Sequence, residues 1–400
     1  MKKVLSAQCY SLYLYSLSMF FLPQIISYSQ FAIILSAIAA VVMVRYAIKN
    51  RKITLITFNT AIIGIILVLL YYFGINSNAE QLQKTFFLVV LGQTFPAVLL
   101  SSIIAGDRQN VEYDNSDVQN IIFINIVALT FLVIMAIVFP NRYTRGGGLT
   151  TEFVLNYQNG SYLCAYISNY IVFTFITDRN ISRIKKIIYI AALIIVTFAM
   201  FAMGGKGGFV TYVFINLILF IYAMKKSGVS ATKIFRNIAI SVVAVLALYL
   251  VISRASNFSL GGSYGFSRIQ ALLSTRNDSG RANIYRKAIE LISQRPILGY
   301  GIGSVFGLLG THAHNLIINC LLEMGIVGTA LLSFLLLNTL MKIPRLIRHD
   351  ENSWVGIIIF LQGFAISMFS GYYLAQTLLF CGIAYIQGKS LRIKHERAQQ

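Results

Sequence analysis

The sequence predicts an all-α, polytopic membrane protein with about twelve transmembrane helices and one enlarged outer loop that carries an amphipathic helix. Three observations predict this class. Hydrophobic residues make up 57% of the chain and charged residues only 12%, whereas globular domains carry about 25% charged residues. Apolar runs recur with lengths of about 20 residues, which is what a bilayer crossing needs. Basic residues gather in alternate loops, as the positive-inside rule requires.

The predicted spans follow one another with short connections through most of the chain. Each is an apolar run that ends at a basic, acidic or glycine-rich loop. The N-terminal stretch lacks a clear small-residue cleavage site, so we expect it to remain as the first span. The predicted spans cover 8–27, 30–47, 53–73, 85–105, 119–139, 160–177, 187–203, 209–224, 237–253 and 314–340, and two more share 354–388.

The charges of the loops predict the orientation of these spans. Two thirds of the 33 Lys and Arg fall in the loops and span ends that this topology places in the cytoplasm. Most of the others lie in segment 254–312, and long translocated segments escape the rule. We therefore expect both termini to be cytoplasmic. An inner loop with Lys342, Arg345 and Arg348 follows the span at 314–340, and a break near Ser370–Gly371 divides the last two spans.

Four regions follow from this topology. Residues 1–253 hold the first nine transmembrane helices, and 254–312 form the enlarged outer loop. Residues 313–388 hold the last three helices, and 389–400 form a basic cytoplasmic tail.

Cysteine usage and net charge exclude other classes of protein. The four cysteines lie in apolar runs, too far apart for a metal knuckle, and are expected to be small apolar core residues without disulfides. The net charge is +20, but no soluble basic domain is present, so we do not expect nucleic-acid binding.

The outer segment contains an amphipathic helix predicted at 281–294. Ile284, Ala288, Leu291 and Ile292 share one face, and Pro296 stops the helix. Such a basic helix can lie on anionic headgroups at the membrane surface. Alternatively, its arginines hold a phosphate-bearing substrate, because the guanidinium group suits two-point contact with phosphate.

A glycine-rich turn with Gly299, Gly301 and Gly303 follows the helix. No strand precedes it, so dinucleotide binding is not expected. The turn either presents backbone N–H groups to an anion or makes a tight connection.

Three polar residues, His312, His314 and Asn315, stand where the outer segment meets the next span. A catalytic zinc usually needs three protein ligands, and the outer face offers few others, so no metal is expected. A neutral imidazole suits a general base instead. Glu323 is an ionisable group inside the span, which makes it a functional candidate or the partner of a basic side chain from another helix.

These residues resemble the O-antigen polymerase and O-antigen ligase superfamily of bacterial envelope enzymes between about Gly280 and Gly328. The resemblance rests on an arginine-led helix, the Pro-Ile-Leu-Gly-Tyr-Gly-Ile-Gly turn, and His314-Asn315 followed by nine residues, Gly325, two residues and Gly328.

The resemblance implies a metal-independent, GT-C-like glycosyltransferase without a cofactor. Its donor would be an undecaprenyl-pyrophosphate-linked glycan at the periplasmic face of the bacterial inner membrane. It implies that His314 is the base and that Arg281 binds the pyrophosphate. A Ser-Arg-Gly-like turn of the family corresponds to Gly205–Lys206–Gly207, where Lys206 keeps the charge and loses the two-point geometry.

Three functions are compatible with this reading. A surface-polysaccharide polymerase, extending a lipid-linked repeat unit, is favoured by the compact segment 254–312. A ligase would transfer the glycan to lipid A-core in lipopolysaccharide biosynthesis. A flippase for lipid-linked oligosaccharide would distribute its charges over several spans, whereas here they gather at one face. A chain-length regulator and a flippase are candidate partners. Further candidate substrate contacts come from His312, Asn315, Glu323, Arg145, Arg254 and Arg286.

Overall fold

The fold was analysed in a computed structural model of the chain. It describes residues 94, 98, 101, 105, 115–138, 157–178, 180–203, 206–227, 232 and 281–398. The predicted spans at 8–27, 30–47, 53–73 and 237–253, most of the span at 85–105, and segment 254–280 lie outside the described residues. The described elements are all helical, which confirms the all-α class for this part of the chain.

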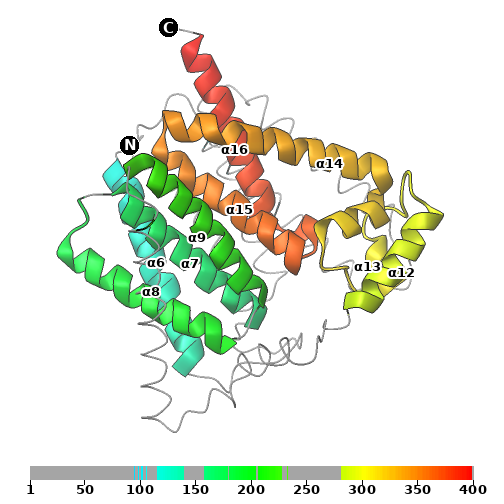
Figure 1. Ribbon diagram of the computed structural model, residues 1–400, viewed down its shortest axis with the longest axis horizontal. Helices are drawn as coiled ribbons and strands as arrows, with labels where there is room; N and C mark the ends of the chain where they lie inside the picture. Colours follow the sequence, from blue (N-terminus) through cyan, green and yellow to red (C-terminus); the bar gives the residue numbers. More distant parts are fainter. Residues whose placement is uncertain are drawn as a thin grey trace, which may run out of the picture. The chain divides into compact units, whose positions relative to one another are not determined.

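The chain divides into two compact units. One unit contains α7 (Tyr157–Thr177), α8 (Arg183–Met203), α9 (Lys206–Ser227) and most of α6 (Asn115–Val138). Within it, α7 packs against both α8 and α9. These helices cover the predicted spans at 119–139, 160–177, 187–203 and 209–224, and Figure 1 shows them labelled.

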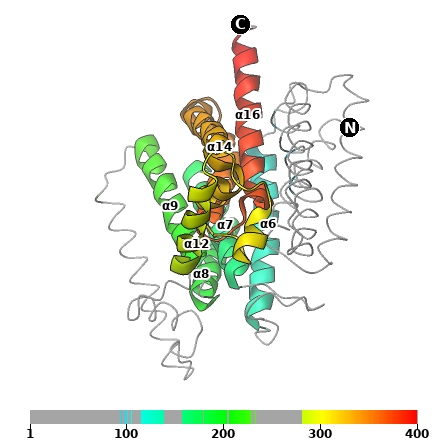
Figure 2. The same ribbon diagram turned by 90° about the vertical axis from the view of Figure 1, so that its right-hand side faces the viewer.

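The other unit contains the helices that follow the described part of the outer segment. They are α12 (Arg281–Gln294), α13 (Ser304–Leu309), α14 (Leu316–His349), α15 (Trp354–Phe369) and α16 (Thr377–Arg397). The short 3₁₀ helices η5 (Glu351–Ser353) and η6 (Tyr373–Ala375) lie in the connections. In Figures 1 and 2, α12 and α13 lie together at the N-terminal end of α14.

Three of the described helices are long and apolar enough to cross a membrane: Gly207–Lys226, Leu316–His349 and Glu351–Phe369. This supports a membrane protein. The total of about twelve spans, the outer position of segment 254–312 and the cytoplasmic position of both termini stay predictions.

Helix α14 is longer than its predicted span at 314–340. It continues to His349, so Lys342, Arg345 and Arg348 belong to its last turns and not to a loop. The helix is kinked at Gly325, and its part from 326 to 349 corresponds to about 36 Å at 1.5 Å per residue, which exceeds the ~30 Å of a bilayer core. Its basic end can therefore extend beyond the hydrocarbon, where the side chains are solvated.

Helices α15 and α16 form the hairpin predicted at 354–388, and the break near Ser370–Gly371 is confirmed because α15 ends at Phe369. The two backbones approach closely at glycines: a Cβ on Gly363 would lie 2.1 Å from the backbone nitrogen of Leu379. Small residues allow such packing between apolar helices. Helix α16 runs to Arg397, so the expected basic tail from 389 continues the helix.

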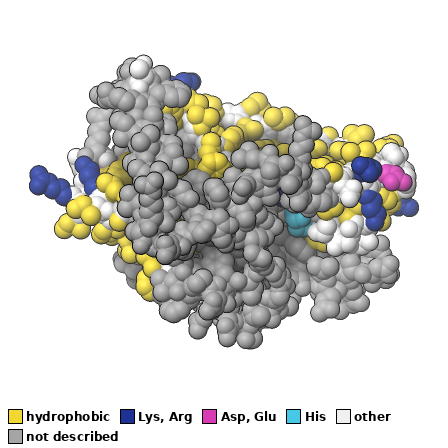
Figure 3. Space-filling view, turned by 60° about the horizontal axis from the view of Figure 1, so that its bottom comes forward, with side chains coloured by type: hydrophobic (Ala, Val, Ile, Leu, Met, Phe, Trp, Pro, Cys, Tyr) yellow, Lys and Arg dark blue, Asp and Glu magenta, His cyan; other side chains and the backbone are white. Residues whose placement is uncertain are grey.

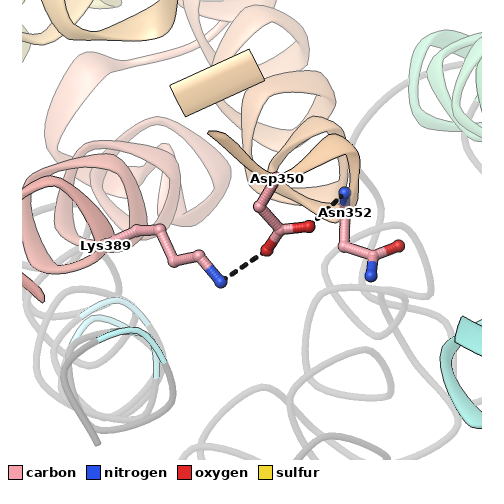
Figure 4. Close-up of polar contacts among 3 residues, drawn as sticks. All are labelled: Asp350, Asn352 and Lys389. Atoms are coloured by element: carbon pink, nitrogen blue, oxygen red, sulfur yellow. Dashed lines mark hydrogen bonds and ion pairs between the residues drawn. The ribbon is translucent and has the colours of Figure 1, made fainter. Parts of the chain in front are cut away.

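An ion pair joins the residue that follows α14 to the second half of α16. Lys389 Nζ lies 2.7 Å from Asp350 Oδ2, and the other carboxylate oxygen of Asp350 accepts from the backbone N–H of Asn352 at 2.9 Å (Figure 4). The backbone N–H of Asp350 caps the end of α14, and its side chain caps η5 and contacts α16. This fixes the turn between α14 and α15.

Candidate active site

The candidate site begins with α12, which coincides with the predicted amphipathic helix at 281–294. Ala288 is fully buried, while Ile284, Leu291 and Ile292 are partly buried on the same face. This face packs against α14 and α13. Arg281 is the first residue of the helix and is partly buried, which places its guanidinium at the positive end of the helix dipole.

The glycine turn after α12 crosses α14 at Gly325, where α14 is broken. Gly325 has φ 62° and ψ −164°, a backbone conformation open essentially to glycine alone. A Cβ on Gly325 would lie 2.2 Å from the carbonyl oxygen of Ile297, and one on Gly299 would lie 2.5 Å from the carbonyl carbon of Glu323. The two segments therefore meet backbone against backbone.

The break in α14 is repaired by an exchange of hydrogen bonds with this turn. The N–H groups of Ile326 and Val327 donate to the carbonyls of Pro296 (2.8 Å) and Ile297 (3.2 Å). The carbonyls of Leu322 and Glu323, which a regular helix would pair with these N–H groups, accept from Tyr300 (2.9 Å) and Gly301 (2.8 Å). Irregular backbone at membrane depth is tolerated where protein groups satisfy it in this way.

This exchange decides between the two interpretations of the glycine turn. The N–H groups of Gly299, Tyr300 and Gly301 donate to backbone carbonyls, and that of Gly303 donates to the Glu323 carboxylate at 3.0 Å. These donors are committed to protein acceptors. The turn is a tight connection that locks the α12 region onto α14.

Two histidines share one acceptor beyond the turn. His312 Nε2 lies 2.9 Å and His314 Nδ1 3.0 Å from the carbonyl oxygen of Ser370, in the break between α15 and α16. A carbonyl oxygen only accepts, so each of these ring nitrogens carries a proton. In the neutral ring, Nε2 is then the unprotonated nitrogen of His314.

The surroundings favour the neutral forms of both rings. Burial lowers the pKa of His312 to about 4, with His314 and Arg281 as further causes, while the Ser370 carbonyl acts in the opposite direction. Burial also lowers the pKa of His314, and the positive charge of Arg281 adds to this effect against the same carbonyl. His314 is the less enclosed of the two, since His312 lies among Phe306, Tyr372 and His314. Figure 3 shows that histidine surface reaches the outside of the molecule.

The backbone around the histidines is fixed by α14. His314 has φ 55°, a left-handed conformation that is uncommon outside glycine. Asn315 caps α14: its Oδ1 accepts from the N–H groups of Ile317 (3.0 Å) and Ile318 (3.1 Å). Asn319 Oδ1 accepts from Ala313 N–H at 2.8 Å. The strained position of His314 is thus held from both sides, as expected of a functional residue.

Glu323 is completely buried, and its carboxylate meets no basic side chain among the hydrogen-bond partners that the structure describes. Tyr372 Oη donates to both carboxylate oxygens at 3.0 Å, and Tyr373 Oη donates to Oε2 at 2.8 Å. A buried carboxylate is costly unless it is paired or hydrogen-bonded. Here two hydroxyls and the Gly303 N–H stabilise it, in place of the cation that was the alternative prediction.

In the described part of the chain, the fold brings together Arg281, His312 and His314. Glu323 joins them through the segment from Ser370 to Tyr373, which contacts the histidines at one end and Glu323 at the other. Arg286 lies on α12 but is exposed, about 140° around the helix from Arg281. Lys206 was expected in a turn and is instead the first residue of α9. Arg145 and Arg254 lie outside the described residues, so their roles stay predictions.

Ser370, Tyr372 and Tyr373 were not predicted from the sequence as part of the site. A backbone carbonyl leaves no signal in a sequence, so the role of Ser370 could not be read there. The Tyr372–Tyr373 pair did carry a signal, since two adjacent phenols at the break of an apolar hairpin need hydrogen-bond acceptors. The described residues hold no group of three metal-ligating side chains.

The fold and the site together define a helical membrane protein with a histidine and arginine site where α12 and the connection after α15 meet the start of α14. Residues 191–333 match the family model described as O-antigen ligase, which confirms the predicted superfamily. This segment covers the second half of α8, all of α9, α12 and α13, and the first half of α14. No significant match was found among curated proteins or among solved structures.

Proposed function

We propose that this protein is a surface-polysaccharide polymerase that transfers an undecaprenyl-pyrophosphate-linked glycan onto a lipid-linked repeat unit. The observation that carries the proposal is the pairing of a tautomer-fixed His314 with the charge of Arg281 in one place. Glycosyl transfer from a pyrophosphate needs a base at one end of the reaction and a cation at the other.

His314 is the proposed base. The acceptor hydroxyl gives its proton to Nε2 as its oxygen bonds to the anomeric carbon of the donor. Nδ1 keeps its own proton, held by the Ser370 carbonyl. A pKa below the usual histidine value keeps the ring neutral, and so ready to accept a proton, at neutral pH.

Arg281 is the proposed partner of the leaving group. When the bond between the anomeric carbon and the pyrophosphate oxygen breaks, the electron pair stays on that oxygen, and undecaprenyl pyrophosphate gains negative charge. A guanidinium at the N-terminal end of α12 stabilises this charge, and the helix dipole acts in the same direction. His312, Asn315, Lys206, Arg286, Arg145 and Arg254 remain proposed contacts to the pyrophosphate or glycan.

The reaction is placed at the periplasmic face of the bacterial inner membrane. The loop charges predict that segment 254–312 lies on the outer side of the membrane. The proposed donor is itself anchored in that membrane by its undecaprenyl chain. The bilayer, the lipid-linked oligosaccharide, a chain-length regulator and a flippase are the proposed partners. No cofactor is needed, because the pyrophosphate is already an activated leaving group.

An O-antigen ligase is the second candidate, and the similarity of residues 191–333 to the O-antigen ligase family favours it. A ligase would use the same base and cation, with lipid A-core as the acceptor. The two candidates therefore differ in the acceptor and not in the chemistry at His314 and Arg281.

A strain lacking the gene tests the choice. Loss of a polymerase leaves lipopolysaccharide capped with single repeats on a gel, whereas loss of a ligase leaves bare core and accumulated lipid-linked polymer. Complementation with the wild-type gene should restore long chains, and His314→Ala should not, with normal membrane levels of the variant. The expected loss is at least about 100-fold, the usual contribution of a general base. Full restoration by His314→Ala would exclude it as the base.

A further inference from the structure

The Ser370 carbonyl that orients both histidines belongs to a short connection between helices. Ser370 and Gly371 follow α15 directly, and both N–H groups donate to the carbonyl of Ile366 at 2.9 Å. Such a connection needs further contacts to hold one carbonyl in one direction. The next two residues, Tyr372 and Tyr373, supply them.

Both tyrosines are buried and directed at Glu323 of α14. Their hydroxyls donate to its carboxylate at 2.8–3.0 Å. The rings contact each other with centroids 5.1 Å apart, and Tyr372 also meets Phe306 of α13 at 4.9 Å. Glu323 therefore ties the α15–α16 connection to α14.

The same carboxylate also holds the other wall of the site. Gly303 N–H donates to Oε1 at 3.0 Å, which fixes the start of α13 and with it Phe306, which lies against His312. The glycine turn before it is bonded to the carbonyl of Glu323 itself through Gly301. One buried residue thus joins the turn after α12 to the connection after α15.

We propose that Glu323 is a positioning residue: through Tyr372 and Tyr373 it aims the Ser370 carbonyl at His312 and His314 and so fixes the ring tautomers. This inference rests on the proposed function only for its kinetic consequence. The structural consequence, a single protonated nitrogen on each ring facing Ser370, holds whatever the substrate is.

The first test is independent of activity. The purified full-length protein, labelled with ¹⁵N-histidine, is studied in bilayers at neutral pH by solid-state NMR. His312→Gln and His314→Gln variants assign the signals. The wild type should show His314 with the proton on Nδ1, and Glu323→Gln should show a mixture of tautomers there. An unchanged single tautomer in Glu323→Gln overturns the proposal even if the enzyme is inactive towards every glycan tried.

The second test uses turnover of lipid-linked glycan. Glu323→Gln and the double variant Tyr372→Phe/Tyr373→Phe should lower kcat by about 10- to 100-fold, as loss of orienting partners does, with KM little changed. Glu290→Gln, an exposed glutamate on α12, is the matched control and should behave as wild type. A merely structural role would lower the yield of folded enzyme without changing kcat per folded molecule.

The pH dependence of activity further distinguishes a positioning role of Glu323 from a merely structural one. The Ser370 carbonyl raises the pKa of His314 against burial and Arg281, so its displacement should lower this pKa further. A base acts in its neutral form, so activity falls as pH drops through its pKa. The acidic limb should therefore move to lower pH in Glu323→Gln. An unshifted limb, or wild-type kcat, overturns the proposal, whereas an inactive wild type contradicts only the proposed function.

Discussion

At the scale of the residue, the chemistry of this site depends on which nitrogen of His314 carries a proton. The sequence marks the histidine, but its tautomer comes from the carbonyl of Ser370, 56 positions further along the chain. The neighbouring His312 takes the second acceptor position of the same oxygen. The ring of His312 also packs against that of His314, with the centroids 4.1 Å apart. A contact of His312 with the glycan stays a proposal.

Arg281 offers the clearest prediction at this scale. Lysine keeps the charge but cannot contact a pyrophosphate with two parallel N–H groups, so Arg281→Lys should lower kcat/KM by about 100-fold. Turnover of lipid-linked glycan by the purified variant measures this. Lys287→Arg, on an exposed position of the same helix, is the control and should stay within about twofold of wild type. Near-normal turnover of Arg281→Lys would show that charge alone is sufficient.

At the scale of the element, α14 is the helix to which the other parts of the site are bonded. Its break at Gly325 frees two carbonyls and two N–H groups, and the glycine turn after α12 pairs with all four. The spacing of Gly325 from His314 then has a structural reason, because the first part of α14 must span the distance from the capped histidine loop to the crossing. A glycine pattern that resembles an anion cradle in sequence is here the contact between two backbones.

Two glycines with positive φ test this reading of the element. Gly325→Ala places a Cβ 2.2 Å from the Ile297 oxygen, whereas Gly310→Ala, with φ 75°, meets nothing within 4 Å. Gly310→Ala should cost only the left-handed strain of about 1 kcal/mol. Gly325→Ala should cost about 3 kcal/mol or more, since overlap adds to strain. Thermal unfolding of the purified variants in detergent compares them; equal losses would show that the crossing contributes little.

At the scale of the whole molecule, the sequence is that of a membrane protein, and three of the described helices are fit to span a bilayer. The part of α14 that follows the break at Gly325 runs to His349, about 36 Å at 1.5 Å per residue, and separates the glycine turn from the basic end of the helix. A bilayer core of about 30 Å fits between them. The ion pair of Asp350 with Lys389 then lies at the end remote from the histidines.

This arrangement predicts opposite accessibility for the two ends of α14. A cysteine at Ser293 on α12 should react with a membrane-impermeant thiol reagent in cells whose outer membrane has been opened. A cysteine at Arg348 should react only after the inner membrane is permeabilised. Both positions are exposed, and Cys164, Cys320 and Cys381 are buried. Cys9 lies outside the described residues, so the unmodified protein is the background control and Cys9→Ser is the background for both variants. Labelling of both positions from the same side would contradict the topology.

The amino-acid sequence by itself determined the helical membrane class, the bounds of α12, the break after α15, and Arg281 and His314 as candidates, because these depend on local periodicity, charge and residue chemistry. Only the tertiary structure decided that the glycine turn binds α14, that the Ser370 carbonyl faces both histidines, and that Glu323 contacts two tyrosines. These features join atoms distant in the chain, and several are backbone groups common to every residue. Their positions follow from packing, which no local pattern encodes.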